Sequence, residues 1–347
     1  MLYDTKNPHG GDIYAGNIRL DFSANINPLG TPESVREAME RALDSVDRYP
    51  DPYCRTLRAA IAKAEGVPEE YVICGNGASE LIYTFAGAFR PGSVAELAPT
   101  FSEYALSVAR RGCPVARYTL SEEKNFAPDA GILDFLRETR PAVFFLCNPN
   151  NPTGRLAAPE LLEEILAVCS EQETFVFADE CFLDLTSGGK SLKPFLSRYP
   201  QLFILKAFTK SCGMAGVRLG YGLCADADVL RDMSAAAPPW NVSSLAQAAG
   251  VAALRETGFL EKTRALVQKE RAWVAEELAA LGYRVIPSDA NFLLFRAAPG
   301  LDGALREKGV LIRNCENYRG LCSGWYRAAV RTHGENEALI QTIREIG

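Results

Sequence analysis

The stretch Phe208-Thr-Lys-Ser-Cys-Gly-Met-Ala-Gly-Val-Arg-Leu-Gly-Tyr221 is the segment around which the rest of the sequence can be organised. It places Thr209 and Lys210 shortly after the apolar run Leu202-Phe-Ile-Leu205, and Arg218 opens a second apolar run. A lysine at the end of a buried strand is unusual, because an ammonium group is costly to desolvate. Such a position lowers the pKa of the lysine and frees an amine for Schiff-base chemistry. The alternative interpretation is a lysine whose charged head lies in water.

Apolar runs typical of buried strands alternate with amphipathic stretches through much of the chain. The runs lie near residues 71–74, 93–98, 115–119, 142–147, 174–178, 202–207 and 218–223. This alternation predicts an α/β fold with a three-layer large domain, in which helices cover both faces of a mostly parallel, seven-stranded sheet. In such sheets ligands bind at the carboxyl ends of the strands.

The two ends of the chain follow other patterns. Residues 1–32 are loop-like, and Thr31 followed by Pro32 is typical of the start of a helix, which we expect to reach about residue 46. After Trp240 we expect a long helical region over 243–281, kinked near Gly258. Short strands and helices are expected near residues 283–286, 291–295, 301–308, 310–313, 326–331 and 335–345. We therefore predict three parts: an N-terminal active-site segment (1–32) packed on the small domain, a large domain (33–240) and a small α+β domain (241–347).

Composition and charge argue against several classes of protein. The 347 residues carry a net charge of −6 with acids and bases interspersed, so no basic stripe indicates a nucleic-acid partner. No apolar run approaches membrane-spanning length, and the first residues lack the apolar region of a signal peptide. Ten cysteines without a CxxC pair, beside only two histidines, argue against a metal site. Scattered cysteines fit a reducing compartment, so we expect a cytoplasmic protein.

Four further motifs place glycines or polar residues at the ends of predicted strands. Gly75-Asn-Gly-Ala-Ser-Glu80 opens a helix whose backbone amides favour an anion, although such a turn is often only a turn. Asn148-Pro-Asn-Asn-Pro-Thr-Gly154 closes another strand, and its Asn-Pro steps disfavour a helix. Phe175-Val-Phe-Ala-Asp-Glu180 carries a carboxylate straight out of an apolar strand, where it needs a partner. Pro99-Thr-Phe-Ser-Glu-Tyr104 ends in an aromatic residue that suits either a flat heterocycle or a protein core.

In this order and spacing, the motifs resemble those of pyridoxal-phosphate-dependent enzymes of the aspartate aminotransferase superfamily (fold type I) over nearly the whole chain. The resemblance implies an aspartate aminotransferase-like fold, with pyridoxal 5'-phosphate as the cofactor bound to Lys210. It implies that Asp179 keeps the pyridine nitrogen protonated, which makes the ring an electron sink. It further implies that Asn151 donates to the phenolic oxygen and that Tyr104 stacks on the ring. The resemblance assigns the cofactor phosphate to Gly77, Ala78, Ser79 and Arg218, and it adds Thr209 as a further cofactor-binding residue.

Within this superfamily the sequence is most similar to the threonine-phosphate decarboxylases of cobalamin synthesis and to the histidinol-phosphate aminotransferases. The motif His9-Gly-Gly11 and the loop 20–30 resemble the decarboxylases, as do the C-terminal segments that contain Arg313 and Arg327. Phe182 stands where many aminotransferases have a tyrosine, so the resemblance leaves Asn151 alone to contact the phenolic oxygen.

The predicted substrate carries two anionic groups. His9, Asn25, Arg313 and Arg327 together suit a carboxylate and a phosphate, and the sequence does not assign either arginine to either group. For any single arginine the alternative is a solvated surface side chain. The family forms homodimers with twofold symmetry, which would place Tyr49 of one subunit in the site of the other.

We predict decarboxylation of O-phospho-L-threonine to (R)-1-aminopropan-2-yl phosphate. The alternative is an aminotransferase acting on histidinol phosphate or a related amino acid. The two reactions differ in which bond at Cα lies perpendicular to the cofactor ring, and the sequence does not show that geometry. A non-enzymatic ligand sensor is a remote third possibility. It is disfavoured because no basic helix-turn-helix segment precedes residue 30 and the cofactor residues are intact.

Overall fold

The large sheet of the predicted fold is present in a computed structural model, which describes residues 9–347. Seven strands pair in the order β2-β8-β7-β6-β5-β3-β4. The pairs are parallel except those of β8, which runs antiparallel to β2 and β7. The strands are β2 (Val72–Gly75), β3 (Val94–Ala98), β4 (Val115–Thr119), β5 (Val143–Cys147), β6 (Phe175–Asp179), β7 (Leu202–Ala207) and β8 (Gly220–Cys224). The prediction of a mostly parallel, seven-stranded sheet is confirmed.

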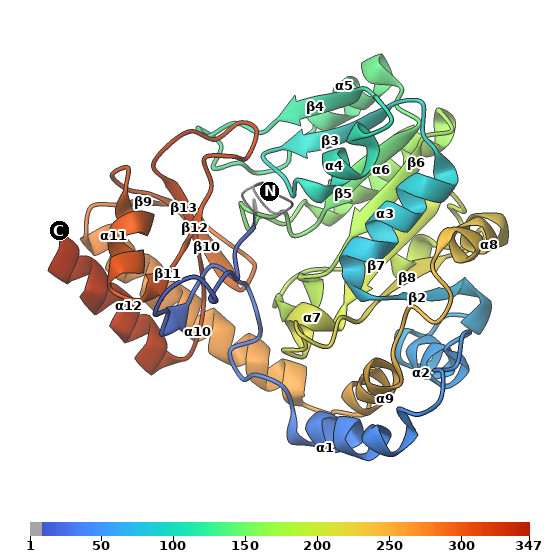
Figure 1. Ribbon diagram of the computed structural model, residues 1–347. Helices are drawn as coiled ribbons and strands as arrows, with labels where there is room; N and C mark the ends of the chain where they lie inside the picture. Colours follow the sequence, from blue (N-terminus) through green and yellow to red (C-terminus); the bar gives the residue numbers. More distant parts are fainter. Residues whose placement is uncertain (1–8) are drawn as a thin grey trace.

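Helices cover both faces of this sheet (Figure 1). They are α2 (Arg55–Glu65), α3 (Gly77–Phe89), α4 (Glu103–Ala109), α5 (Gly131–Thr139), α6 (Pro159–Glu171), α8 (Ala227–Ala236) and α9 (Ser244–Ala253). Because successive residues of a strand point to opposite faces, the sheet has two cores. Phe145 and Phe177 pack with α3, α4 and α8 on one face, and Phe144 and Val176 pack with α2, α5, α6 and α9 on the other.

A second, antiparallel sheet lies beside the first, with strand order β12-β13-β10-β9 (Figure 1). Its strands are β9 (Arg284–Val285), β10 (Phe292–Arg296), β12 (Arg313–Asn314) and β13 (Trp325–Ala329). Its helices are α10 (Phe259–Ala280), α11 (Leu301–Glu307) and α12 (His333–Ile346). The N-terminal segment joins this unit, because β1 (Leu20–Asp21) pairs in parallel with β11 (Val310–Leu311) and Phe22 enters its core.

Shorter elements complete the chain. They are α1 (Glu33–Ala42), α7 (Phe208–Ser211), and the 3-10 helices η1 (Leu43–Ser45), η2 (Glu69–Tyr71), η3 (Leu183–Leu185) and η4 (Lys193–Phe195). The division into 1–32, 33–240 and 241–347 stays a prediction, and the first eight residues of that N-terminal segment lie outside the described residues. None of the helices within residues 9–347 has both the length and the apolar character needed to cross a membrane.

Two local predictions are wrong. The region 243–281 is not one kinked helix, because α9 ends at Ala253 and α10 begins only after Gly258, whose φ of 74° is incompatible with a continuous right-handed helix. Thr31 does not cap α1, because its hydroxyl donates to the carbonyl of Gly213 at 2.9 Å, although α1 and the contiguous η1 do extend to Ser45 as expected. The Thr31 hydroxyl, which the local pattern predicts to cap the helix, instead bonds to a residue that is distant in sequence.

Candidate active site

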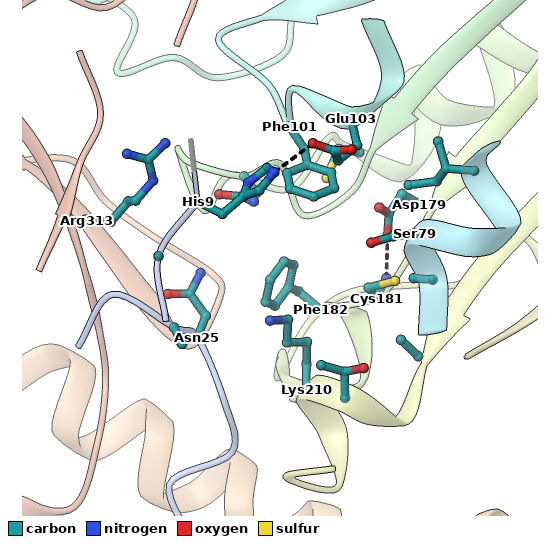
Figure 2. A pocket seen from close by; sticks show the side chains of 18 of the residues that line it. His9, Asn25, Ser79, Phe101, Glu103, Asp179, Cys181, Phe182, Lys210 and Arg313 are labelled. Atoms are coloured by element: carbon teal, nitrogen blue, oxygen red, sulfur yellow. Dashed lines mark hydrogen bonds and ion pairs between the residues drawn. The ribbon is translucent and has the colours of Figure 1, made fainter. Parts of the chain in front are cut away.

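A cavity of about 370 Å³ lies at the carboxyl ends of the parallel strands. This volume lies within the range of small-molecule sites. The cavity lies between the large sheet on one side and the N-terminal segment with the second sheet on the other (Figure 2). It is lined by most of the residues predicted for the site, namely His9, Asn25, Ala78, Ser79, Asn151, Asp179, Thr209, Lys210, Arg218, Arg313 and Arg327.

The topology of the large sheet explains why residues distant in sequence meet here. Strands β5, β6 and β7 are parallel neighbours, and their register pairs Cys147 with Asp179 and Asp179 with Leu205. The strand ends therefore lie at one edge, and the chain that leaves β5 and β7 carries Asn151 and Lys210 to the same cavity as Asp179. Strand β8 is antiparallel, so it begins at this edge, two residues after Arg218.

Lys210 lies on α7, the single helical turn that follows β7. It is half-buried, because the cavity reaches its amine. Burial, together with the positive charge of Arg327, lowers the pKa of Lys210 to about 8. Its Nζ lies 5.7 Å from the centre of the Phe182 ring. Roughly a tenth of this lysine is therefore a neutral, nucleophilic amine at pH 7, far more than at its ordinary pKa.

Asp179 ends β6 as a buried carboxylate that faces the cavity. It accepts one hydrogen bond from the hydroxyl of Tyr104 at 2.7 Å and one from the backbone N–H of Cys181 at 2.9 Å. These two donors satisfy carboxylate oxygens that would otherwise be buried without a hydrogen-bond partner. The arrangement leaves a fixed carboxylate for a positively charged or protonated group of a ligand.

The prediction that Tyr104 forms an aromatic wall of the site is wrong. Tyr104 is fully buried and does not line the cavity. It stacks on Phe145 in the core, with ring centres 5.3 Å apart and an angle of 8° between the ring planes. Phe101 of the same motif lines the cavity instead. The reason is that α4 begins at Glu103, so the helix turns Tyr104 toward the sheet while Phe101 stays in the preceding loop.

An anion cradle forms where α3 begins. Gly77 opens this 13-residue helix with φ of 80°, and Ala78 and Ser79 line the cavity. A Cβ atom on Gly77 would lie only 2.5 Å from Nη2 of Arg218, so glycine lets the guanidinium approach the helix end. Backbone amides, the helix dipole and a guanidinium together form a strong site for a phosphate.

Asn151 and Arg327 form a connected pair on the opposite wall. The Asn151 side-chain oxygen accepts a hydrogen bond from Nη1 of Arg327, and Nη2 of Arg327 donates to the backbone oxygen of Ser23 at 2.7 Å. Nε of Arg327 and both amide atoms of Asn25 are buried without a hydrogen-bond partner among the described residues. Unpartnered polar atoms in a lined cavity are groups that a bound ligand would satisfy.

Arg313 lies on β12 of the second sheet, and His9 lies on the N-terminal segment. Strand register places Arg313 directly across from Arg327 on neighbouring strands β12 and β13. Nη2 of Arg313 donates to Asn317 at 2.7 Å, and the guanidinium lies 5.2 Å from the centre of the Tyr318 ring. Figure 2 shows Arg313 and Asn25 on the left of the view, His9 beside Phe101 and Glu103, and Asp179 on the right beyond Phe182 and Lys210.

Besides Tyr104, the predicted residues Gly77 and Tyr49 do not line this cavity, although Gly77 contacts Arg218 at the start of α3. Tyr49 lies on the surface. It is 78% exposed and stacks on Trp240, with ring centres 4.5 Å apart. Sequence reasoning also missed Phe101, Glu103, Cys181 and Tyr318, which all line the cavity. Phe101 and Glu103 belong to the motif Pro99–Tyr104 that the sequence analysis identified, and Cys181 directly follows the motif that ends at Glu180, so these motifs were a usable signal.

Comparisons with known proteins agree with this geometry. Residues 17–343 match the family model "Aminotransferase class I and II". The chain is 36% identical to the threonine-phosphate decarboxylase of Salmonella typhimurium, over 97% of this chain and 96% of that protein. It is 38% identical to the histidinol-phosphate aminotransferase of Sphingopyxis alaskensis, over 95% of this chain and 91% of that protein.

A solved structure extends the comparison to three dimensions. The histidinol-phosphate aminotransferase of Clostridium acetobutylicum superposes with a TM-score of 0.88 at 29% identity, covering 94% of this chain and 99% of the other. Sequence and structure thus agree over nearly the whole length. The chain belongs to the aminotransferase class I and II family and is a pyridoxal-phosphate-dependent enzyme, either a decarboxylase or an aminotransferase.

Proposed function

We propose that this enzyme decarboxylates O-phospho-L-threonine to (R)-1-aminopropan-2-yl phosphate, a step of cobalamin biosynthesis. The observation that carries the proposal is the presence of Arg313, Arg327 and His9 around one cavity that also contains Lys210. This set suits an amino acid with two anionic groups. The similarity to a threonine-phosphate decarboxylase over 97% of the chain supports the choice of substrate.

The residues present fit pyridoxal phosphate as the cofactor. The close approach of Arg218 to Gly77 at the start of α3 suits its phosphate, and Thr209 lines the same cavity. Asp179, held by Tyr104 and Cys181, suits the pyridine nitrogen, and Asn151 suits the phenolic oxygen. When bound, pyridoxal phosphate supplies an electron sink for negative charge that develops at the substrate Cα.

We propose that the two arginines divide the substrate between them. Arg327 is buried and held by Asn151 and Ser23, which suits the carboxylate next to the reacting carbon. Arg313 is half-buried, and Arg327 but not Arg313 is among the main charges that shift the pKa of Lys210, so Arg313 together with His9 suits the phosphate. Asn25 would use its unpartnered amide on the substrate. Fixing both ends of the substrate determines which bond at Cα can break.

Lys210 is the residue that would move protons at the reacting carbon. Its pKa of about 8 makes it a competent base and acid near neutral pH. In decarboxylation Lys210 would deliver a proton to Cα after carbon dioxide leaves. In transamination the same amine would remove the proton from Cα at the start.

Transamination is the second candidate, because the chain is 38% identical to a histidinol-phosphate aminotransferase. That substrate also carries a phosphate, so Arg313 and His9 would serve either reaction. The two proposals differ in what leaves Cα. The residues proposed for the phosphate would be shared, but histidinol phosphate has no carboxylate for Arg327 to bind.

We propose further that the enzyme acts as a twofold homodimer in which Tyr49 reaches the site of the other subunit. The stacked pair of Tyr49 and Trp240 leaves both rings exposed, at 78% and 44%, which is unusual for large aromatic side chains. Sedimentation should give twice the chain mass, and Tyr49→Ala should impair turnover.

The deciding experiment supplies the holoenzyme with O-phospho-L-threonine and no keto acid. A decarboxylase releases carbon dioxide over many turnovers. An aminotransferase performs one half-reaction and stops until 2-oxoglutarate is added. If the enzyme stops, and histidinol phosphate with 2-oxoglutarate restores cycling, the aminotransferase proposal is correct. Binding of both ligands without conversion would instead identify a sensor.

A further inference from the structure

Glu103 is an acidic residue in a cavity that is otherwise rich in cationic groups. Besides Asp179, the cavity wall contains Lys210, Arg218, Arg313 and Arg327. A carboxylate beside a site for a doubly anionic substrate should repel that substrate. Neither cofactor binding nor proton transfer uses Glu103, so its position needs another explanation.

Both oxygens of the Glu103 carboxylate are taken by neighbours. Oε1 lies 2.7 Å from Nε2 of His9, and Oε2 accepts a hydrogen bond from the hydroxyl of Tyr83 at 2.7 Å. Glu103 is only 8% exposed, and the His9 ring packs against Phe101 with ring centres 5.6 Å apart. Figure 2 shows the contact between Glu103 and His9 at the edge of the cavity.

The carboxylate on α4 therefore links helix α3 to the N-terminal segment, which is far from both helices in sequence. Glu103 lies in the first turn of α4, Tyr83 on α3, and His9 on the N-terminal segment. The hydrogen bond from His9, partly opposed by burial, lowers the pKa of Glu103, so the group is ionised at neutral pH. A charge-assisted hydrogen bond of this kind holds a ring more firmly than a neutral one.

We propose that Glu103 is a positioning residue of the anion subsite, which holds the His9 imidazole at the cavity edge where that ring contacts the anionic end of the substrate. The inference rests on the proposed function for its substrate, but not on whether the reaction is decarboxylation or transamination. Its consequence is counterintuitive: removing the negative charge of Glu103 weakens the binding of an anion.

The first test measures binding of inorganic phosphate to the holoenzyme by calorimetry. Glu103→Ala should weaken phosphate binding about tenfold, since a charge-assisted contact is lost from His9. Glu103→Gln keeps an acceptor for His9 and should recover part of this loss. Tyr83→Phe, which removes only the second hydrogen bond to Glu103, should weaken binding two- to threefold. Tighter phosphate binding by Glu103→Ala would mean that the carboxylate merely repels anions and would overturn the proposal.

A double-mutant cycle tests whether Glu103 acts through His9. His9→Asn combined with Glu103→Ala should bind phosphate no more weakly than His9→Asn alone. Fully additive losses would show an effect independent of His9 and contradict the proposal. Melting temperature and cofactor absorbance verify folding. If Glu103→Ala does not fold, the same cycle can be measured by combining His9→Asn with Glu103→Gln or with Tyr83→Phe.

Steady-state kinetics separate positioning from a purely structural role. With O-phospho-L-threonine, Glu103→Ala should raise KM about tenfold and leave kcat within about twofold. With L-threonine, which has no phosphate, both constants should stay near the wild-type values. Equal losses on both substrates would identify a structural residue. If phosphate binding responds as expected but O-phospho-L-threonine is not converted, the proposed function fails while this inference stands.

Discussion

Lys206 and Lys210 are close in sequence, yet the protein shifts the pKa values of their side chains in opposite directions. Burial alone would lower the pKa of Lys206, but the surrounding Tyr221, Asp184 and Glu65 raise it well above its ordinary value. Its amine lies 2.8 Å from Glu65 and 2.9 Å from Asp184. Lys210 faces the cavity near Arg327, and its pKa falls to about 8. The difference shows that the charges around a buried lysine, and not burial alone, decide its state.

The same contrast separates two adjacent acids at the end of β6. Asp179 faces the cavity, whereas Glu180 accepts hydrogen bonds from the Ser191 hydroxyl at 2.6 Å and the Leu192 backbone N–H at 2.8 Å. Burial raises the pKa of Glu180 to about 7, although the charge of Lys206 opposes the shift. At the end of β6, Asp179 therefore faces the cavity, whereas Glu180 holds the segment around Ser191 and Leu192 by hydrogen bonds.

The largest expected effect is the loss of turnover in Lys210→Ala. Removing the amine should lower kcat by about three powers of ten or more, because no other group would replace it as nucleophile and proton carrier. The melting temperature should change little. Borohydride treatment of the wild-type holoenzyme should attach the cofactor to the peptide that contains Lys210. Attachment to another lysine would refute the assignment.

The matched change, Lys206→Met, should affect stability instead of chemistry. It leaves Glu65 and Asp184 without their buried cation, which should cost about 3–5 kcal/mol in the free energy of unfolding. Urea denaturation measures this loss, and kcat per folded molecule should stay within a few fold of wild type. A stable variant without activity would reverse the roles that we assign to the two lysines.

The pH dependence of that loss provides a further check. Burial alone would raise the pKa of Glu65, but Lys206, Tyr221 and Lys193 lower it to about 2. Its ionised form therefore stabilises the fold above pH 4.5, and this contribution is lost as the pH falls toward 2. The difference between wild type and Lys206→Met should shrink over that interval. A difference that is constant with pH would exclude a charge effect.

Asp179 and Glu180 should differ as Lys210 and Lys206 do: one affects the rate and the other does not. The effect on the rate should be somewhat smaller than that of Lys210→Ala. Asp179→Ala should lower kcat by about two powers of ten or more while the cofactor still binds, because its phosphate cradle is separate. Tyr104→Phe, which removes one hydrogen bond to Asp179, should cost about tenfold or less. Glu180→Gln is the control and should leave kcat nearly unchanged. Near-normal turnover by Asp179→Ala would show that this carboxylate is only structural.

The smallest expected effect is a gain in stability for the cofactor-free enzyme with Lys210→Met. The pKa of Lys210 is about 8 in the folded chain, below its ordinary 10.5, so protonation opposes folding. The penalty is complete below pH 8 and disappears as the pH rises above 10.5. Because the cavity admits solvent, we expect a gain of only about 1–2 kcal/mol at pH 7, and none near pH 10.5. Denaturation at both pH values measures it, and no gain at pH 7 would show that the amine is fully solvated.

Several features of this protein could be predicted from the sequence. Strands that are covered by helices on both faces consist of continuous apolar residues. The seven apolar runs before residue 224 correspond to the seven strands of one sheet. Strand ends in a parallel sheet meet at one edge, so the glycines, Asp179 and Lys210 placed after such runs were expected at one site. These are consequences of local pattern and connectivity, which a single sequence contains.

Other features depend on contacts between distant segments, and only the tertiary structure decided them. Local pattern could not tell whether Phe101 or Tyr104 faces the cavity, because that depends on the residue at which α4 begins and on the side of the sheet that it covers. Nor could it show that Thr31 bonds to Gly213, or that Glu103 reaches both His9 and Tyr83. The opposite states of Lys206 and Lys210 have the same origin, since the charges that set them come from α2, η3 and β13. Electrostatic and packing energies depend on distance in space, and sequence spacing does not determine that distance.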